Sequence, residues 1–127
     1  MAVILEIPGR LDGLNEYTRA CRSKSWQAGA EMKKKNEAKV IGCILDQLQD
    51  VYIDYPVTVE FIWFEKDSRR DLDNIAFAKK FILDAMVKTG TLKDDSQKYI
   101  HGFTDTVFTH CNPSVRVIFK KCGDGFA

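Results

Sequence analysis

Residues 57–90 read VTVEFIWFEKDSRRDLDNIAFAKKFILDAMVKTG and decide the fold class. Residues Val57 to Phe64 alternate β-branched and aromatic side chains, which predicts a strand with one inward face formed by Val57, Val59, Phe61 and Trp63. From about Leu72 to Thr89 the apolar residues recur at helical spacing, and Gly90 stands where a C-terminal cap is expected. A buried strand followed by an amphipathic helix predicts a sheet that is covered by helices.

The flanking sequence extends this pattern in both directions. Residues 2–7 predict a short strand that ends at Pro8-Gly9, and the segment from about Ala30 to Leu48 has helical spacing. Residues 15–29 are ambiguous. Phe103 to His110 and Ser114 to Lys120 predict a hairpin joined near Cys111-Asn112-Pro113. The order of elements predicts an α+β fold, with residues 1–127 forming a single domain and a small mixed sheet backed by helices.

Length and composition exclude several classes of protein. A chain of 127 residues with 45% hydrophobic and 29% charged residues is typical of one globular domain, and not of a disordered or collagen-like chain. No apolar run is longer than five residues, so we expect no membrane span. The four cysteines form no C-x-x-C pair, and the first apolar run ends at Glu6 without a basic leader. We therefore expect a cytoplasmic protein with reduced thiols.

Positive charge is concentrated in one region, although the net charge is only +1. Between Arg10 and Lys39 there are eight basic residues and four acidic ones. Such an excess predicts a surface that binds DNA phosphates, and a solvated helical face is the alternative. The predicted DNA contacts are Arg19, Arg22, Lys24, Lys33, Lys34 and Lys35, with Arg69 and Arg70 before the second helix.

Four carboxylates bracket the predicted helix 72–89. Asp71 and Asp73 precede or begin it, and Asp94 and Asp95 follow it. Carboxylate oxygens are the ligands that Mg²⁺ prefers, so the four acids are candidate metal ligands. The alternative interpretation gives the acids no metal. Asp71 would then cap the helix, Asp73 would be an acid of the first turn, and Asp94 and Asp95 would be loop residues.

Two adjacent lysines lie in the same predicted helix. On a uniform helical wheel, Lys80 falls within about 40° of Asp73 and Asp84, whereas Lys79 falls on the apolar side. A lysine beside the acids could neutralise a phosphate during metal-dependent phosphoryl transfer. Lys80 is therefore the candidate catalytic lysine, and Lys79 is a possible substitute.

Three motifs of this region occur together: Asp71-Leu72-Asp73-Asn74, then Lys80-x₃-Asp84-Ala85-Met86, then Gly90-x-Leu92-x-Asp94-Asp95. This combination resembles the RusA family of Holliday-junction resolvases, which are small homodimeric Mg²⁺-dependent endonucleases of bacteria, phages and prophages. In the family pattern the lysine stands four residues after the second aspartate, where this chain has Phe77. Alignment from the Asp84-Ala85-Met86 end places Lys80 on that lysine instead.

The resemblance implies an α+β, RusA-like endonuclease that resolves Holliday junctions by paired phosphodiester cleavage in recombination and repair. Its implied catalytic residues are Asp71, Asp73, Asp95 and Lys80, and its implied metal ligands are Asp71, Asp73, Asp95 and Asp94, with Mg²⁺ or Mn²⁺ as the ion. The implied partners are a four-way DNA junction and a second copy of the chain. Two alternatives are a branched-DNA-binding module without activity and another Mg²⁺-dependent phosphohydrolase. The latter is disfavoured because a G-x-x-x-x-G-K loop is missing.

Overall fold

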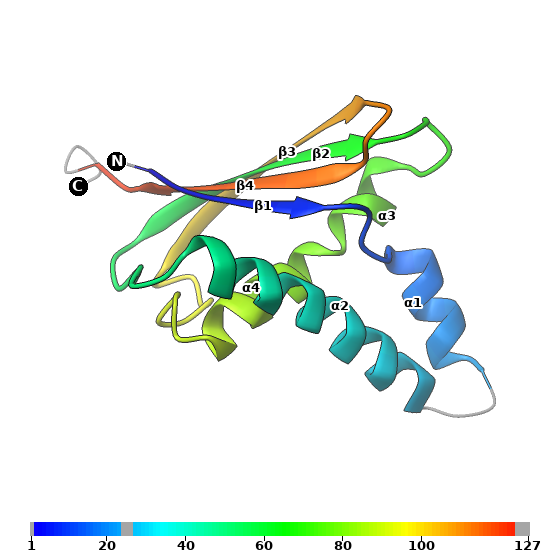
Figure 1. Cartoon of the computed structure of the whole chain (residues 1–127), viewed down its shortest axis with the longest axis horizontal. Helices are drawn as coiled ribbons and strands as arrows, with labels where there is room; N and C mark the ends of the chain where they lie inside the picture. The colour runs from blue at the N-terminus through cyan, green and yellow to red at the C-terminus, as the bar shows by residue number, and fades with distance from the viewer. Residues whose placement is uncertain (1, 24–26, 124–127) are drawn as a thin grey trace.

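A computed structural model describes residues 2–23 and 27–123 of the chain. In this part the order of elements is β1 (Ala2–Pro8), α1 (Leu14–Cys21), α2 (Gln27–Gln47), β2 (Val57–Glu65), α3 (Leu72–Ala76), α4 (Lys79–Lys88), β3 (Ile100–Thr109) and β4 (Ser114–Lys121). The strands form one layer, and α2 and α4 lie beneath it (Figure 1). The predicted α+β fold with a sheet backed by helices is confirmed.

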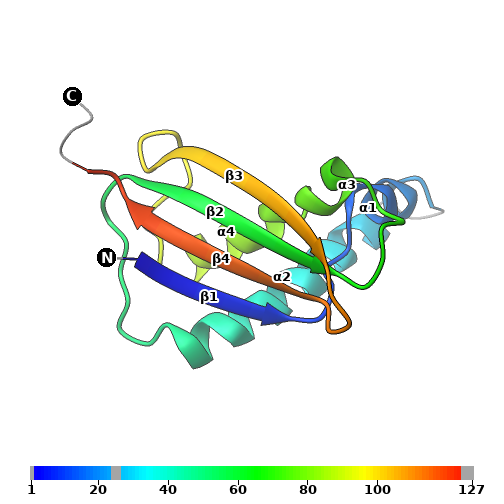
Figure 2. The ribbon, with the colours of Figure 1, turned by 90° about the horizontal axis from the view of Figure 1, so that it is seen from above.

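The four strands form a mixed sheet in the order β1-β4-β2-β3 (Figure 2). β2 and β3 are parallel, whereas β4 is antiparallel to both of its neighbours, β1 and β2. The parallel pair requires a crossover connection, which α3 and α4 provide. This crossover carries the residues that the sequence singles out.

The core lies between the sheet and the two longer helices. The predicted inward face of β2 is confirmed, since Val57, Val59, Phe61 and Trp63 are all buried. They pack in one cluster with side chains of α2 and α4, among them Val40, Ile44, Phe81, Ile82 and Met86. Gly90 has a positive φ of 77°, which is the backbone conformation expected of a glycine that ends a helix.

The predicted hairpin between β3 and β4 is wrong. The two strands are joined by residues 110–113, but β2 lies between them in the sheet. Burial explains the arrangement. The inward residues of β4 are buried, namely Val115, Val117 and Phe119, whereas most of β3 is exposed. A strand with a buried face gains more stability from pairing with a strand on each side. β4 is therefore central, and β3 forms an edge.

The single helix predicted over residues 72–89 is also wrong, because it is divided into α3 and α4. At the junction, the N–H groups of Ala78, Lys80 and Phe81 bond to carbonyls only three residues earlier. This tighter 3₁₀-type spacing rotates α4 relative to a uniform helix. The side chains on α4 therefore point in directions that a continuous helical wheel does not predict.

No helix within residues 2–23 and 27–123 combines the length and the apolar character that crossing a bilayer requires. The four cysteines are free thiols.

Candidate active site at the start of α3

A shallow hollow of about 500 Å³ lies where α1, α3, α4 and β3 meet. Its wall is mainly apolar, and its polar groups are the side chains of Asp73, Lys79 and Asp105. The other lining residues are Leu14, Leu72, Ala76 and Phe77. The hollow is open to solvent and presents both carboxylate and ammonium groups. It could therefore bind a cation and a phosphate.

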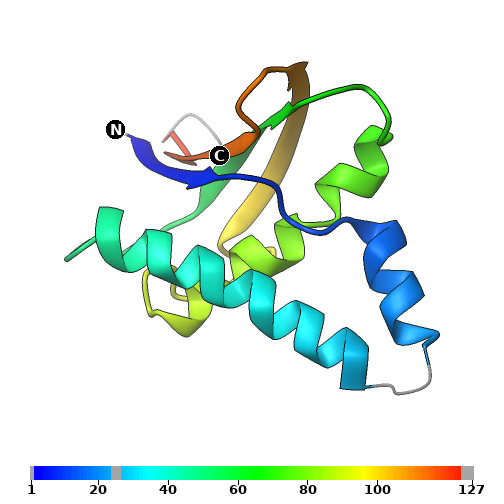
Figure 3. The ribbon, with the colours of Figure 1, turned by 45° about the vertical axis from the view of Figure 1, so that its right-hand side comes forward.

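The start of α3 is fixed by its contact with α1, and the two helices lie side by side at one end of the sheet (Figure 3). The buried Asn74 accepts the N–H of Asn15 on its Oδ1, at 2.7 Å. A Cβ atom at Gly13 would lie 2.6 Å from the carbonyl oxygen of Asn74, so only glycine allows this approach. Asn74 therefore supports the helix start and holds Asp73 at the hollow.

Arg70 anchors the loop that carries Asp71. Its guanidinium donates two hydrogen bonds of 2.9 Å to the carboxylate of Glu65, and others to the Leu11 carbonyl and to Glu16. Only 11% of its side chain is exposed. The prediction that Arg70 contacts DNA does not fit this geometry, because its donors already bond to Glu65, Glu16 and the Leu11 carbonyl. Its neighbour Arg69 is 89% exposed and can reach a ligand.

Asp71 and Asp73 both expose carboxylate oxygens near the first turn of α3. Asp71 occupies the N-cap position without making a side-chain capping hydrogen bond. Asp73 accepts the N–H of Asn74 on Oδ1 at 2.9 Å, which leaves Oδ2 free of that bond. Neither carboxylate forms an ion pair within the described residues. Two exposed carboxylates fit Mg²⁺, which proteins often bind through one or two carboxylates while water and substrate phosphate complete its shell.

Lys79, and not Lys80, shares the hollow with Asp73. The Lys79 Nζ donates to Asp105 Oδ2 at 2.6 Å and lies 4.9 Å from the ring centroid of Phe103. Lys80 is exposed and lies 3.5 Å from Asp84. The division between α3 and α4 explains the difference, because it turns Lys79 away from the apolar side where the uniform wheel placed it.

Asp105 is a site residue that the sequence did not reveal. Its Oδ1 accepts the indole N–H of the buried Trp63 at 2.9 Å, while Oδ2 accepts from Lys79. Trp63 thereby ties the pair to the core of β2. The sequence indicates Asp105 only as a single acid among the threonines of residues 104–109. Nothing in the sequence pairs it with Lys79.

Asp94 and Asp95 do not reach this hollow within one chain. They follow α4, whose ten residues rise about 15 Å, and their loop lies at the other end of the sheet from α3 (Figure 1). Across the described residues, no three His, Cys, Asp or Glu side chains lie close enough together to share a metal ion. The expected site, in which Asp95 or Asp94 joins Asp71 and Asp73 to hold one or two ions, is therefore not found among the described residues of a single chain.

The other predicted DNA contacts belong to residues 19–35. Arg19 and Arg22 line a second hollow with Leu14, which also borders the Asp73 hollow. Lys34 and Lys35 are exposed on α2, and Lys24 lies outside the described residues.

Lys33 is held by acids. Its Nζ lies 3.2 Å from Asp84 and 3.7 Å from Glu37, and the hydrogen bond to Asp84 raises the pKa of Lys33. Neutralising Lys33 would therefore remove two ion pairs within the protein, so its predicted DNA contact cannot be tested separately from them.

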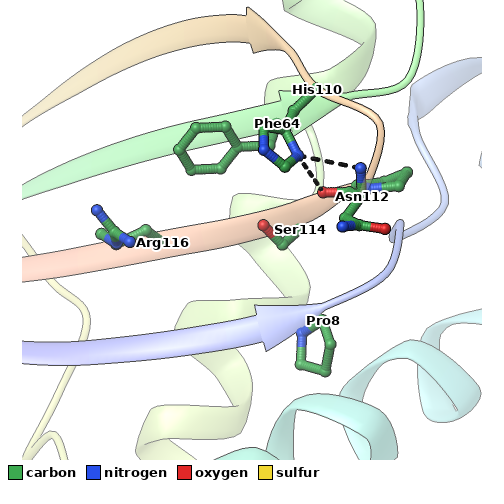
Figure 4. Close-up of a pocket in the computed structure, with 7 residues that line it drawn as sticks. Pro8, Phe64, His110, Asn112, Ser114 and Arg116 are labelled. Carbon is green, nitrogen blue, oxygen red and sulfur yellow. Dashed lines mark hydrogen bonds between the residues drawn. The ribbon is translucent and has the colours of Figure 1, made fainter.

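Another hollow lies on the face of the sheet that the helices leave uncovered (Figure 4). Phe64, His110 and Arg116 point into it, and His110 accepts the N–H of Asn112 on Nδ1 at 3.0 Å. Arg116 donates to Glu6 at 2.8 Å, so its charge is already paired. Among the described residues no carboxylate lines this hollow, so it offers no candidate metal ligand of the kind found at the start of α3.

A scan against protein-family models found no family that matches the chain, and a search of curated proteins found no match either. The fold class is thus established by the structure alone. The resemblance to the RusA family stays a prediction, and so does the activity that it implies.

Proposed function

We propose that this chain is a metal-dependent, structure-selective DNA endonuclease of the RusA type, which resolves Holliday junctions in the cytoplasm. The observation that carries the proposal is the hollow at α3, where Asp73 and Lys79 face the same open space beside Asp71. A phosphodiester approaching this hollow would meet an ammonium group and exposed carboxylates together, which is the combination that metal-assisted hydrolysis uses.

In this proposal Asp71 and Asp73 hold Mg²⁺ or Mn²⁺. Such an ion, when bound, supplies Lewis-acid activation of water and neutralises phosphate charge. Lys79 offsets the negative charge that develops on the phosphate oxygens. Asp105 and Trp63 hold the ammonium group at the hollow, so little reorganisation is needed when the substrate binds.

A homodimer remains part of the proposal, since a four-way junction has two symmetric scissile strands and a two-fold dimer presents two equivalent sites. Asp94 and Asp95 lie beyond the far end of α4, as described above. They could therefore join the carboxylates at α3 only from the other copy. Within one chain, the ligands proposed for the ion are Asp71 and Asp73.

DNA would approach along α1. Arg19 and Arg22 border the Asp73 hollow through their shared neighbour Leu14, and Lys34 and Lys35 extend the positive surface onto α2. These side chains would contact phosphates, so they supply affinity and orientation and do not read sequence.

Cleavage of a synthetic four-way junction tests the proposal. Purified protein is incubated with labelled junction and with linear duplex, in the presence and absence of Mg²⁺. We expect paired incisions in the junction, dependent on Mg²⁺, and at most weak cleavage of the duplex. If the junction stays intact with both Mg²⁺ and Mn²⁺, the proposed activity is wrong.

The two lysines provide a matched pair of variants for the same assay. Lys79→Gln removes the ammonium group from the hollow and should lower the cleavage rate by about 100-fold or more. Lys80→Gln removes an exposed charge outside it and should leave the rate within about threefold. If Lys80→Gln lowered the cleavage rate more than Lys79→Gln, Lys80 would be the catalytic lysine instead.

A branched-DNA-binding module without cleavage is the second candidate. It is favoured by the lack of a three-acid cluster within the described part of one chain. Such a module would bind the junction tightly and leave it uncut under every metal condition, and the wild-type assay separates the two functions directly.

A further inference from the structure

The two edge strands of the sheet differ in how their free edges are protected. At β1 the side chain of Gln47 accepts the N–H of Glu6 at 2.8 Å and donates to the Glu6 carbonyl at 2.6 Å. β1 also ends at Pro8, which has no N–H to offer. Within the described residues, no strand and no side chain hydrogen-bonds to the backbone of β3 along its outer edge. The edge of β3 is therefore open.

The sequence of β3, IHGFTDTVFT, has few of the residues that keep edges apart, and its one inward-facing charge, Asp105, is paired with Lys79. It contains no lysine, arginine or proline, and its threonines and aromatic residues favour strand pairing. Phe103, Val107 and Phe108 are 46%, 40% and 53% exposed. A ten-residue open edge with exposed apolar side chains is expected to pair with another strand.

The residue order within β3 indicates that the partner strand is the β3 of a second copy. Around Asp105 the sequence is nearly symmetric, with Thr104 and Thr106 on one face, and Phe103 and Val107 on the helix-covered face. In antiparallel pairing with a second β3 about Asp105, threonine meets threonine and Phe103 meets Val107. The two Asp105 side chains would be neighbours, but each already has its own counter-charge in Lys79.

We propose that β3 is the contact surface between two copies of this chain, which pair antiparallel about Asp105 into one continuous sheet. Thr104 of each copy then lies opposite Thr106 of the other, and the helices of both copies lie on the same side. The inference deepens the homodimer that the proposed function includes. Its test measures mass without DNA or metal. A failure of the β3 surface or register therefore leaves the proposed cleavage standing, and a failure of cleavage leaves the β3 dimer standing.

Two double variants of the full chain test both the surface and the register. Thr104 and Thr106 are exposed on the face away from the helices, so charged residues should be tolerated there. In Thr104→Lys/Thr106→Lys, the proposed register places lysine opposite lysine twice. In the matched variant Thr104→Lys/Thr106→Glu, it places lysine opposite glutamate twice. Ile4→Lys, at an exposed apolar position of the other edge strand, is the control.

Analytical ultracentrifugation over a range of concentrations should find a wild-type dimer of the 14.5 kDa chain. The dissociation constant of the double-lysine variant should exceed that of the lysine–glutamate variant by about tenfold or more. Ile4→Lys should dissociate like wild type, and circular dichroism confirms that each variant is folded. A monomeric wild type, equal dissociation constants for the two double variants, or dissociation by Ile4→Lys would each overturn the proposal.

Discussion

The adjacent arginines before α3 should respond very differently to substitution. Arg70→Gln removes a guanidinium that bonds to Glu65, Glu16 and the Leu11 carbonyl, in a site where only 11% of the arginine side chain is exposed. Breaking a buried ion pair by removing one partner typically costs 3–5 kcal/mol, because the remaining charge stays buried. Since Glu16 also loses a partner but can still pair with Arg10, we expect about 3 kcal/mol.

For a domain of this size, that loss corresponds to about 10 °C in Tm. The matched control is Arg69→Gln, which removes an 89% exposed side chain whose nearest acid is 3.7 Å away. Its cost should stay within about 0.5 kcal/mol. Urea denaturation monitored by tryptophan fluorescence, to which the buried Trp63 contributes, measures both values. A cost below about 1 kcal/mol for Arg70→Gln would refute the view that this arginine anchors the loop.

The other predictions concern the DNA surface, the helix contact and one thiol. Replacing Lys34 and Lys35 by glutamine should weaken junction binding and lower the slope of log affinity against log salt by about two, and an unchanged slope would place the phosphates elsewhere. Gly13→Ala should cost about 1–3 kcal/mol in unfolding free energy, since its Cβ would lie 2.6 Å from the Asn74 carbonyl oxygen, and a neutral result in urea denaturation would show that α1 can move away. Burial raises the pKa of the Cys43 thiol above its ordinary value of 9.0, so the thiol adds stability below pH 9.0 and this contribution is lost as pH rises through the higher folded pKa. The alkaline loss of stability should therefore be smaller in Cys43→Ala, and equal pH profiles would contradict this.

The strands and the long helix were predictable because each shows one buried face in the sequence. β2 has strict alternation, and α2 places apolar residues at helical spacing from about residue 40. The position of β3 was not predictable from local pattern. Proximity in sequence favours a hairpin between β3 and β4. The two strands are separated because β4, with its buried face, occupies a central position in the sheet.

The candidate site was predictable in part. The acids at 71 and 73 stand out by spacing, and the structure places both near one exposed turn. The position of Lys79 at the hollow was hidden because the sequence around Phe77 and Ala78 contains no glycine or proline that would indicate the division between α3 and α4. The contacts of Arg70 were hidden because a pair of adjacent arginines resembles a charged surface. Its burial depends on Glu65, which lies on β2, and on Glu16, which is distant in sequence.

The central claim is that the carboxylates at the start of α3 serve phosphodiester cleavage and are not simply exposed acids of a helix start. Its most direct test measures binding and cleavage of one labelled four-way junction by wild type and by Asp73→Asn, in the presence of Mg²⁺. Asp73 is exposed and makes one local hydrogen bond, so the variant should fold and bind like wild type. We predict that junction binding is retained and that cleavage falls by at least about 100-fold. Cleavage at the wild-type rate by Asp73→Asn would contradict the account.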